Sequence, residues 1–200
     1  MAARADRQAD RRRQILDAAV KVFARSGFHT SRVGDIAEEA GVAYGLVYHY
    51  FTSKEELLET IFRDTWTQML ARVQEVEASG VSAGEQVRQV TALLLRTWRR
   101  DPDLVRVLVR EVTRSQHVQQ EIEEITQAMT VLEGIIRRGQ ETGEFRAGLD
   151  PRLAAVVFYG ALDEVLSGWV LGQLPDTDED IAAAERNVVL LLVDGMREPS

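Results

Sequence analysis

The sequence predicts an all-α protein of about nine helices in two parts, a head over residues 1–53 and a body over residues 54–200. Apolar side chains recur at spacings of three, four and seven residues, which place them on one face of a helix. No segment shows the apolar–polar alternation of a half-buried strand, and no internal repeat is visible. Glycine and proline residues separate the helical segments, as is usual at helix ends.

Charge differs between the two parts. Residues 1–54 carry a net charge of +3, whereas the remaining 146 residues carry −11. A basic head can approach a polyanion such as DNA while the acidic body is repelled, and binding of this kind weakens as salt rises. An acidic enzyme with a basic N-terminus would show similar bulk charges, so this pattern supports a nucleic-acid-binding head only together with its motifs.

Several classes of protein are disfavoured by composition. The chain has no cysteine, which excludes a disulfide framework and a thiolate zinc site. Its longest uninterrupted apolar stretch, Leu153–Leu162, is about half as long as a membrane span. The first ten residues are charged and do not resemble a secretion signal. We therefore expect a soluble, cytoplasmic protein with no membrane partner.

The first predicted helix follows a polar segment, Ala2–Asp10, which has no apolar face and is predicted to be a mobile arm. Gly27 ends this helix where a C-terminal glycine is expected. Its inner face is formed by Ile15, Leu16, Ala19, Val22 and Phe23. Thr30 or Ser31 is predicted to cap the next helix, and a cap hydroxyl beside free backbone N–H groups also suits a phosphate. Ser31 and Arg32 are therefore candidate DNA contacts.

Two short helices joined by a tight turn are predicted over Val33–Phe51. Val33, Ile36, Ala37 and Ala40 share one face, and Gly41 supplies the permissive backbone of the turn. The second helix, Ala43–Tyr50, turns Val47 and Leu46 inward. Its outer face is rich in aromatic residues and consists of Tyr44, Gly45, Tyr48 and His49.

This pattern suits a helix-turn-helix whose second helix enters the DNA major groove, with tyrosine hydroxyls and the histidine reaching phosphates and bases. A helical hairpin with half-buried aromatics is the alternative. The predicted DNA contacts are Ser31, Arg32, Ala43, Tyr44, Gly45, Tyr48, His49, Tyr50 and Lys54.

A long helix is predicted over Lys54–Glu77. Ser53 and Glu56 have the spacing of a capping box at its start, and about two dozen helical residues span roughly 35 Å. This helix is therefore long enough to connect head and body. Lys54 lies in the first turn, where a cation is unfavourable to the helix dipole. A DNA phosphate or a neighbouring carboxylate would compensate.

The body is predicted to contain five further helices after a loop at Ala78–Ala83. They are expected at Gly84–Arg99, Pro102–Arg114, Val118–Thr142, Pro151–Leu174 and Asp178–Met196.

Large apolar side chains in these helices are candidates for a ligand cavity. Singly each is more typical of a protein core, but together they suit a long apolar ligand that makes many weak contacts. The candidates are Trp66, Met69, Leu95, Trp98, Leu108, Met129, Leu132, Phe158, Leu162 and Trp169. Arg106, Arg110 and Arg114 follow one edge of a helix and would form either a solvated face or a binding ladder for an anionic headgroup.

The segment RRRQILDAAVKVFARSGFHTSRVGDIAEEAGVAYGLVYHYFTSKEEL resembles the DNA-binding domain of TetR-family transcriptional regulators. The resemblance implies a three-helix helix-turn-helix DNA-binding domain over residues 1–53 and a helical ligand-binding and dimerisation domain over residues 54–200. It implies a homodimer that binds a palindromic operator in double-stranded DNA and responds to a small hydrophobic effector. In this family the last two helices of each subunit form a four-helix bundle with those of its partner.

A narrower resemblance concerns the body. The segments LVRVLVREVTRSQ and IIRRGQETGEFRAGLDPRLAAVVFYGALDEVLSGWVL resemble the TetR-type regulators of fatty-acid degradation. This resemblance implies a long-chain acyl-CoA as effector and no other cofactor. The regulator itself would be a repressor or an activator, and a repressor released from its operator by the effector is the prediction. A TetR-type regulator of an efflux or other catabolic gene, with a different hydrophobic effector, is the alternative.

An enzyme acting on an acyl substrate is a more distant alternative. The sequence contains no nucleophile-elbow, phosphate-loop, dinucleotide or H-E-x-x-H motif. His29, His49 and His117 lie in three different segments without an acidic partner at ligand spacing. Carboxylates such as Asp163 near the arginines are better explained by ion pairing. We therefore predict no catalytic residue and no metal site.

Overall fold

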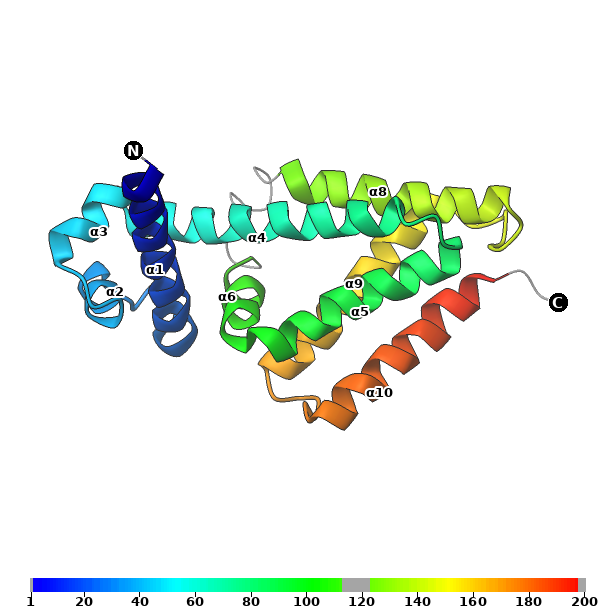
Figure 1. Cartoon of the computed structure of the whole chain (residues 1–200). Helices are drawn as coiled ribbons and strands as arrows, with labels where there is room; N and C mark the ends of the chain where they lie inside the picture. Colours follow the sequence, from blue (N-terminus) through cyan, green and yellow to red (C-terminus); the bar gives the residue numbers. More distant parts are fainter. Residues whose placement is uncertain (1, 113–122, 198–200) are drawn as a thin grey trace.

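The computed structural model of the protein describes residues 2–112 and 123–197. Within these residues it contains nine α-helices, one π-helix and no strand, which confirms the predicted fold class. Figure 1 shows an elongated molecule in which the head lies at one end and the long helix α4 runs from it into the body. An isolated bridge joins Phe145 to Arg197 near the C-terminus.

The head consists of α1 (Ala2–Ser26), α2 (Val33–Glu39) and α3 (Tyr44–Tyr50), packed against the first turns of α4 (Lys54–Glu77). Its core is apolar and contains Ile15, Val22, Phe23, Ile36, Val47, Phe51, Leu57 and Phe62. The three helices of the head therefore bury the faces that their apolar spacing predicts.

The prediction of a mobile arm at Ala2–Asp10 was wrong, because α1 already begins at Ala2. The segment is rich in Ala and Arg, which are good helix formers. Extending an existing helix adds one hydrogen bond per residue without the cost of a new nucleus. The packed part of α1 therefore stabilises its polar extension.

The predicted cap of α2 was also wrong. Arg32, rather than Thr30 or Ser31, is the N-cap residue, and its backbone N–H donates to the Asp35 carboxylate at 3.0 Å. The turns behave as predicted, since Gly27 and Gly41 have φ values of 77° and 62°. These values lie in the left-handed region that favours glycine.

The start of α4 follows its predicted cap closely. Ser53 Oγ accepts a hydrogen bond from the Glu56 N–H at 3.1 Å. The Glu56 carboxylate reaches one residue further than a capping box requires and accepts from the Thr52 hydroxyl at 2.7 Å and the Thr52 N–H at 2.6 Å. These two hydrogen bonds hold the pKa of Glu56 below its ordinary value.

The body is built around α4 from five further α-helices and a terminal π-helix. They are α5 (Ala83–Arg100), α6 (Pro102–Val112), α8 (Glu123–Glu141), α9 (Pro151–Val170), α10 (Asp178–Val188) and the π-helix η1 (Val189–Asp194). α8 packs along α4 and α9, and α5 packs against α8, α10 and η1. α6 lies between α5, α9 and α1, so it touches both body and head.

The end of α9 differs from its prediction. The helix stops at Val170 rather than Leu174, because Gly172 adopts a left-handed φ of 66°. Leu174 folds back against Gly168, and the Trp169 indole N–H donates to the Pro175 carbonyl at 3.1 Å. The last predicted helix is α-helical only to Val188 and continues as η1.

Candidate functional site

The outer face of α3 is exposed as predicted. Tyr44 is 56% and Tyr48 44% exposed, whereas Val47 on the opposite face is buried. Ala43, Gly45 and His49 are exposed as well. Tyr50 is only partly exposed and packs against the head core. The exposure of this face favours a reading helix over a hairpin whose aromatics pack inside.

The two exposed tyrosines form a pair. The hydroxyls of Tyr44 and Tyr48 share a hydrogen bond at 3.3 Å, and the rings meet edge to face with centroids 5.2 Å apart. This hydrogen bond raises the pKa of Tyr48. A tyrosine hydroxyl is neutral at physiological pH, so the exposed Tyr48 is able to donate a hydrogen bond to a phosphate or a base edge.

Ser31, which was predicted to contact DNA, is engaged inside the head. Ser31 is only 4% exposed, and its hydroxyl donates to the Gly27 carbonyl at 2.6 Å. Because the hydroxyl is buried and occupied, the structure does not present it to a phosphate. Arg32, the next residue, is exposed beside the start of α2.

The Lys54 ammonium is held by backbone carbonyls. It donates to the carbonyl oxygens of Phe28 at 2.6 Å, Ser31 at 3.0 Å and His29 at 3.4 Å, and lies 4.5 Å from the centre of the Phe28 ring. Its three donors are thus used within the protein. These contacts tie the start of α4 to the loop between α1 and α2, and they replace the phosphate or carboxylate that we expected.

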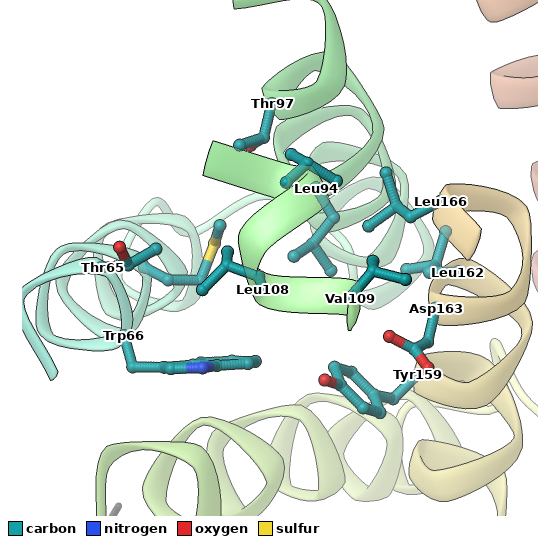
Figure 2. A pocket seen from close by; sticks show the side chains of 12 residues that line it. Thr65, Trp66, Leu94, Thr97, Leu108, Val109, Tyr159, Leu162, Asp163 and Leu166 are labelled. Carbon is teal, nitrogen blue, oxygen red and sulfur yellow. The ribbon is translucent and has the colours of Figure 1, made fainter. Parts of the chain in front are cut away.

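An apolar cavity of ≈ 150 Å³ lies between α4, α5, α6 and α9 (Figure 2). Its lining is mainly aliphatic and aromatic, and none of the described lining residues is basic. The lining residues are Thr65, Trp66, Met69, Leu94, Thr97, Val105, Leu108, Val109, Tyr159, Leu162, Asp163 and Leu166. This is the kind of site that an apolar ligand fills.

The structure divides the predicted ligand residues into two groups. Trp66, Met69, Leu108 and Leu162 line the cavity. The others belong to the body core or pack against it, outside the lining: Leu95, Trp98, Met129, Leu132, Phe158 and Trp169. Trp98 and Trp169, for example, stack on each other with ring centroids 6.3 Å apart.

Several lining residues were missed by the sequence analysis. Asp163 was considered as an ion-pair partner or a catalytic carboxylate and not as part of a ligand site, and Tyr159 was not considered. A usable signal existed, because the two are four residues apart and therefore share a face of the apolar helix α9. The threonines in the lining are satisfied locally, since the hydroxyls of Thr65 and Thr97 donate to the carbonyls of Ile61 and Leu93.

The arginines of α6 lie away from this cavity, on the side of the helix that meets the head. Arg110 donates to the Ala24 carbonyl of α1 at 3.2 Å. Arg106 pairs with Asp103 at 2.7 Å and lies over the Trp98 ring. Arg106 and Arg110 therefore do not line the cavity but border a separate pocket together with Lys21 and Arg25. Arg114 and His117 fall outside the described residues.

Exposed apolar side chains gather on α9 and η1. Leu153 is 62% and Leu191 75% exposed, and Val156, Val157 and Leu190 are also exposed. By length and composition alone α9 could cross a membrane, but core helices of soluble proteins meet the same criteria. We call the five exposed residues Leu153, Val156, Val157, Leu190 and Leu191 the α9–η1 face. So large an apolar face is typical of a surface that a partner covers.

Two family models match consecutive parts of the chain. Residues 15–61 match the model described as bacterial regulatory proteins, tetR family, and residues 62–195 match the C-terminal region of YsiA-like proteins. The boundary between the two matches lies within α4, the helix that joins head and body.

Relatives and solved structures of similar proteins agree with these matches. The chain is 36% identical over 185 residues, 92% of this chain and 94% of the relative, to the fatty acid metabolism regulator protein of Bacillus subtilis (strain 168). It is similar to the crystal structure of the transcriptional regulator FadR from Bacillus subtilis in complex with stearoyl-CoA, with a TM-score of 0.81, 34% identity, and coverage of 92% of this chain and 98% of that one. FadR from Bacillus halodurans gives a TM-score of 0.80 at 31% identity over 92% and 98% of the chains.

Proposed function

The chain belongs to the TetR family of bacterial transcriptional regulators, and from this premise we propose that it is a homodimeric repressor that a long-chain acyl-CoA releases from a palindromic operator. The apolar cavity between α4, α5, α6 and α9 is the observation that carries the proposal. A similar protein was crystallised with stearoyl-CoA, which supports the ligand class. Such a regulator acts where the operator DNA is, in the cytoplasm.

Two helices that line the cavity, α4 and α6, also contact the head, which gives a route from ligand to DNA. α4 contributes Trp66 and Met69 to the cavity and Leu57 to the head core. α6 contributes Leu108 to the cavity, and its Arg110 donates to a carbonyl of α1. A displacement of either helix therefore moves the head.

The size of the cavity indicates why a ligand would displace these helices. Drug-sized ligands occupy pockets of about 300–1,000 Å³, whereas this cavity measures ≈ 150 Å³. A long acyl chain therefore has to widen it by moving the elements that line it. In a population-shift mechanism, a hundredfold loss of operator affinity requires only about 2.7 kcal/mol of difference in ligand affinity between the two arrangements.

Addition of stearoyl-CoA is expected to raise the melting temperature and to release the operator. Saturation at one hundred times the dissociation constant stabilises the folded state by about 2.7 kcal/mol. Thermal unfolding and fluorescence anisotropy on an operator selected from random DNA measure the two effects. Acetyl-CoA is the matched control, because it has the same headgroup without the chain. Equal responses to both compounds, or to neither, would contradict the proposal.

Tyr44→Ala is expected to weaken specific operator binding about tenfold to hundredfold, the range for loss of one good base contact. Stearoyl-CoA affinity should remain unchanged, because Tyr44 lies on the exposed face of α3 and not in the cavity. Tyr44→Phe removes only the hydroxyl, so it distinguishes the contribution of the hydroxyl to operator affinity from that of the ring. Anisotropy titrations with the selected operator and with scrambled DNA provide the measurement. If the Tyr44→Ala protein binds both DNAs with wild-type affinity, Tyr44 does not contact the operator.

A further inference from the structure

The indole N–H of Trp66 is a hydrogen-bond donor in the wall of the cavity that is buried and has no partner among the described residues. A buried donor without a partner destabilises the folded state. By contrast, the indole N–H of Trp169, in the core of the same body, donates to the Pro175 carbonyl. The buried, unpaired donor of Trp66 would gain a partner if a ligand acceptor entered beside it.

Polar groups of α9 face this tryptophan. Figure 2 shows Trp66 extending from α4 toward Tyr159, with Asp163 one helical turn along α9. The ring centroids of Trp66 and Tyr159 are 6.1 Å apart and the ring planes are inclined by 49°. These three side chains form a small polar cluster in an otherwise apolar cavity.

The titratable groups around the cluster indicate whether it suits a charged or a neutral acceptor on the ligand. Burial raises the pKa of the Tyr159 hydroxyl, and the Asp163 carboxyl adds to this shift. Burial also raises the pKa of Asp163, with a smaller contribution from Glu164. Because none of the described lining residues is basic, a ligand carboxylate would meet an acidic group here and no cation. A neutral acceptor oxygen avoids this cost.

We propose that the Trp66 indole N–H, assisted by the Tyr159 hydroxyl, donates a hydrogen bond to the carbonyl oxygen of an acyl thioester. The acyl chain then lies along the aliphatic part of the lining, formed by Leu94, Leu162 and Leu166. Trp66 is on α4, the helix that continues into the head. Recognition of the carbonyl thus takes place on the helix that leads to the DNA-binding helices. This inference rests on the proposed acyl-CoA ligand.

The test compares stearoyl-CoA with S-octadecyl-CoA, a thioether in which a methylene replaces the carbonyl. Trp66→Phe is expected to lower the affinity for stearoyl-CoA about threefold to tenfold more than the affinity for the thioether, the range for one hydrogen bond. Isothermal titration calorimetry measures both dissociation constants. Tyr159→Phe removes a single oxygen and is expected to cause a smaller selective loss in the same direction.

Met69→Leu is the matched control, since Met69 lines the same cavity from the same helix and has no donor. It is expected to change both affinities by the same factor. Equal changes for the two ligands in both the Trp66 and the Tyr159 variants would overturn the inference and leave the proposed function intact. Failure of the wild-type protein to bind either compound would overturn the proposed function itself. A melting temperature for each variant distinguishes loss of a contact from loss of the fold.

Discussion

Leu153→Asp is expected to convert the dimer to monomers and to lower operator affinity at least a hundredfold. Leu153 is 62% exposed on the α9–η1 face, so its replacement leaves the core of the subunit intact. In a two-fold interface the new carboxylate is buried twice, once from each subunit. A single head then loses the gain from linked binding, which is about 10²–10⁴ in affinity.

Sedimentation velocity and operator anisotropy measure the two effects of this substitution. Val81→Asp is the matched control, because Val81 is an exposed apolar residue in the loop between α4 and α5, outside the α9–η1 face. The control should remain dimeric and bind the operator normally. A Leu153→Asp protein that is still dimeric and binds with wild-type affinity would show that the interface lies elsewhere.

Lys54→Met is expected to lower the melting temperature by about 4–8 °C and to weaken operator binding. The substitution leaves the carbonyls of Phe28 and Ser31 without their charged donor. Loss of a hydrogen bond to a charged group costs about 2 kcal/mol, and a domain of this size melts about 2–4 °C lower for each kcal/mol. Stearoyl-CoA affinity should not change, because Lys54 is remote from the cavity.

The salt dependence of binding distinguishes this role from a phosphate contact. Loss of one phosphate contact reduces the slope of log affinity against log salt by about 0.9 and leaves stability unchanged. Loss of the carbonyl contacts lowers stability and leaves the slope unchanged. Arg63→Met removes an exposed cation from the same helix and controls for general charge. A Lys54→Met protein with a normal melting temperature and a smaller slope of log affinity against log salt would show that Lys54 contacts a DNA phosphate.

The helices of the head were predictable because their signals are local. The turn at Gly41 and the cap at Ser53 depend on residues within one helical turn, so the predicted limits of α4 agree with the structure. The segment Ala2–Asp10 was mispredicted because its own residues give no local signal for a packed helix. Whether a polar segment is helical depends on the packed helix that it extends.

The exposed face of α3 was predictable as well, since one face of so short a helix must pack on the head. The cavity was not. A large apolar side chain shows the same periodicity whether it fills a core, as Leu95 and Phe158 do, or borders a cavity, as Leu108 and Leu162 do. Sequence periodicity gives the direction of a side chain relative to its own helix and not the space opposite it.

The sequence by itself therefore determined the all-α fold and the exposure of Tyr44 and Tyr48 on α3, because short-range hydrogen bonding and helical periodicity specify these features. The family followed from the resemblance of the N-terminal segment to TetR-type regulators. The tertiary structure decided three others: the place of the Lys54 ammonium, the cavity, and the separation of the α6 arginines from it. The cavity joins residues from Thr65 to Leu166. Contacts over such a distance depend on how four helices pack together, which no single segment encodes.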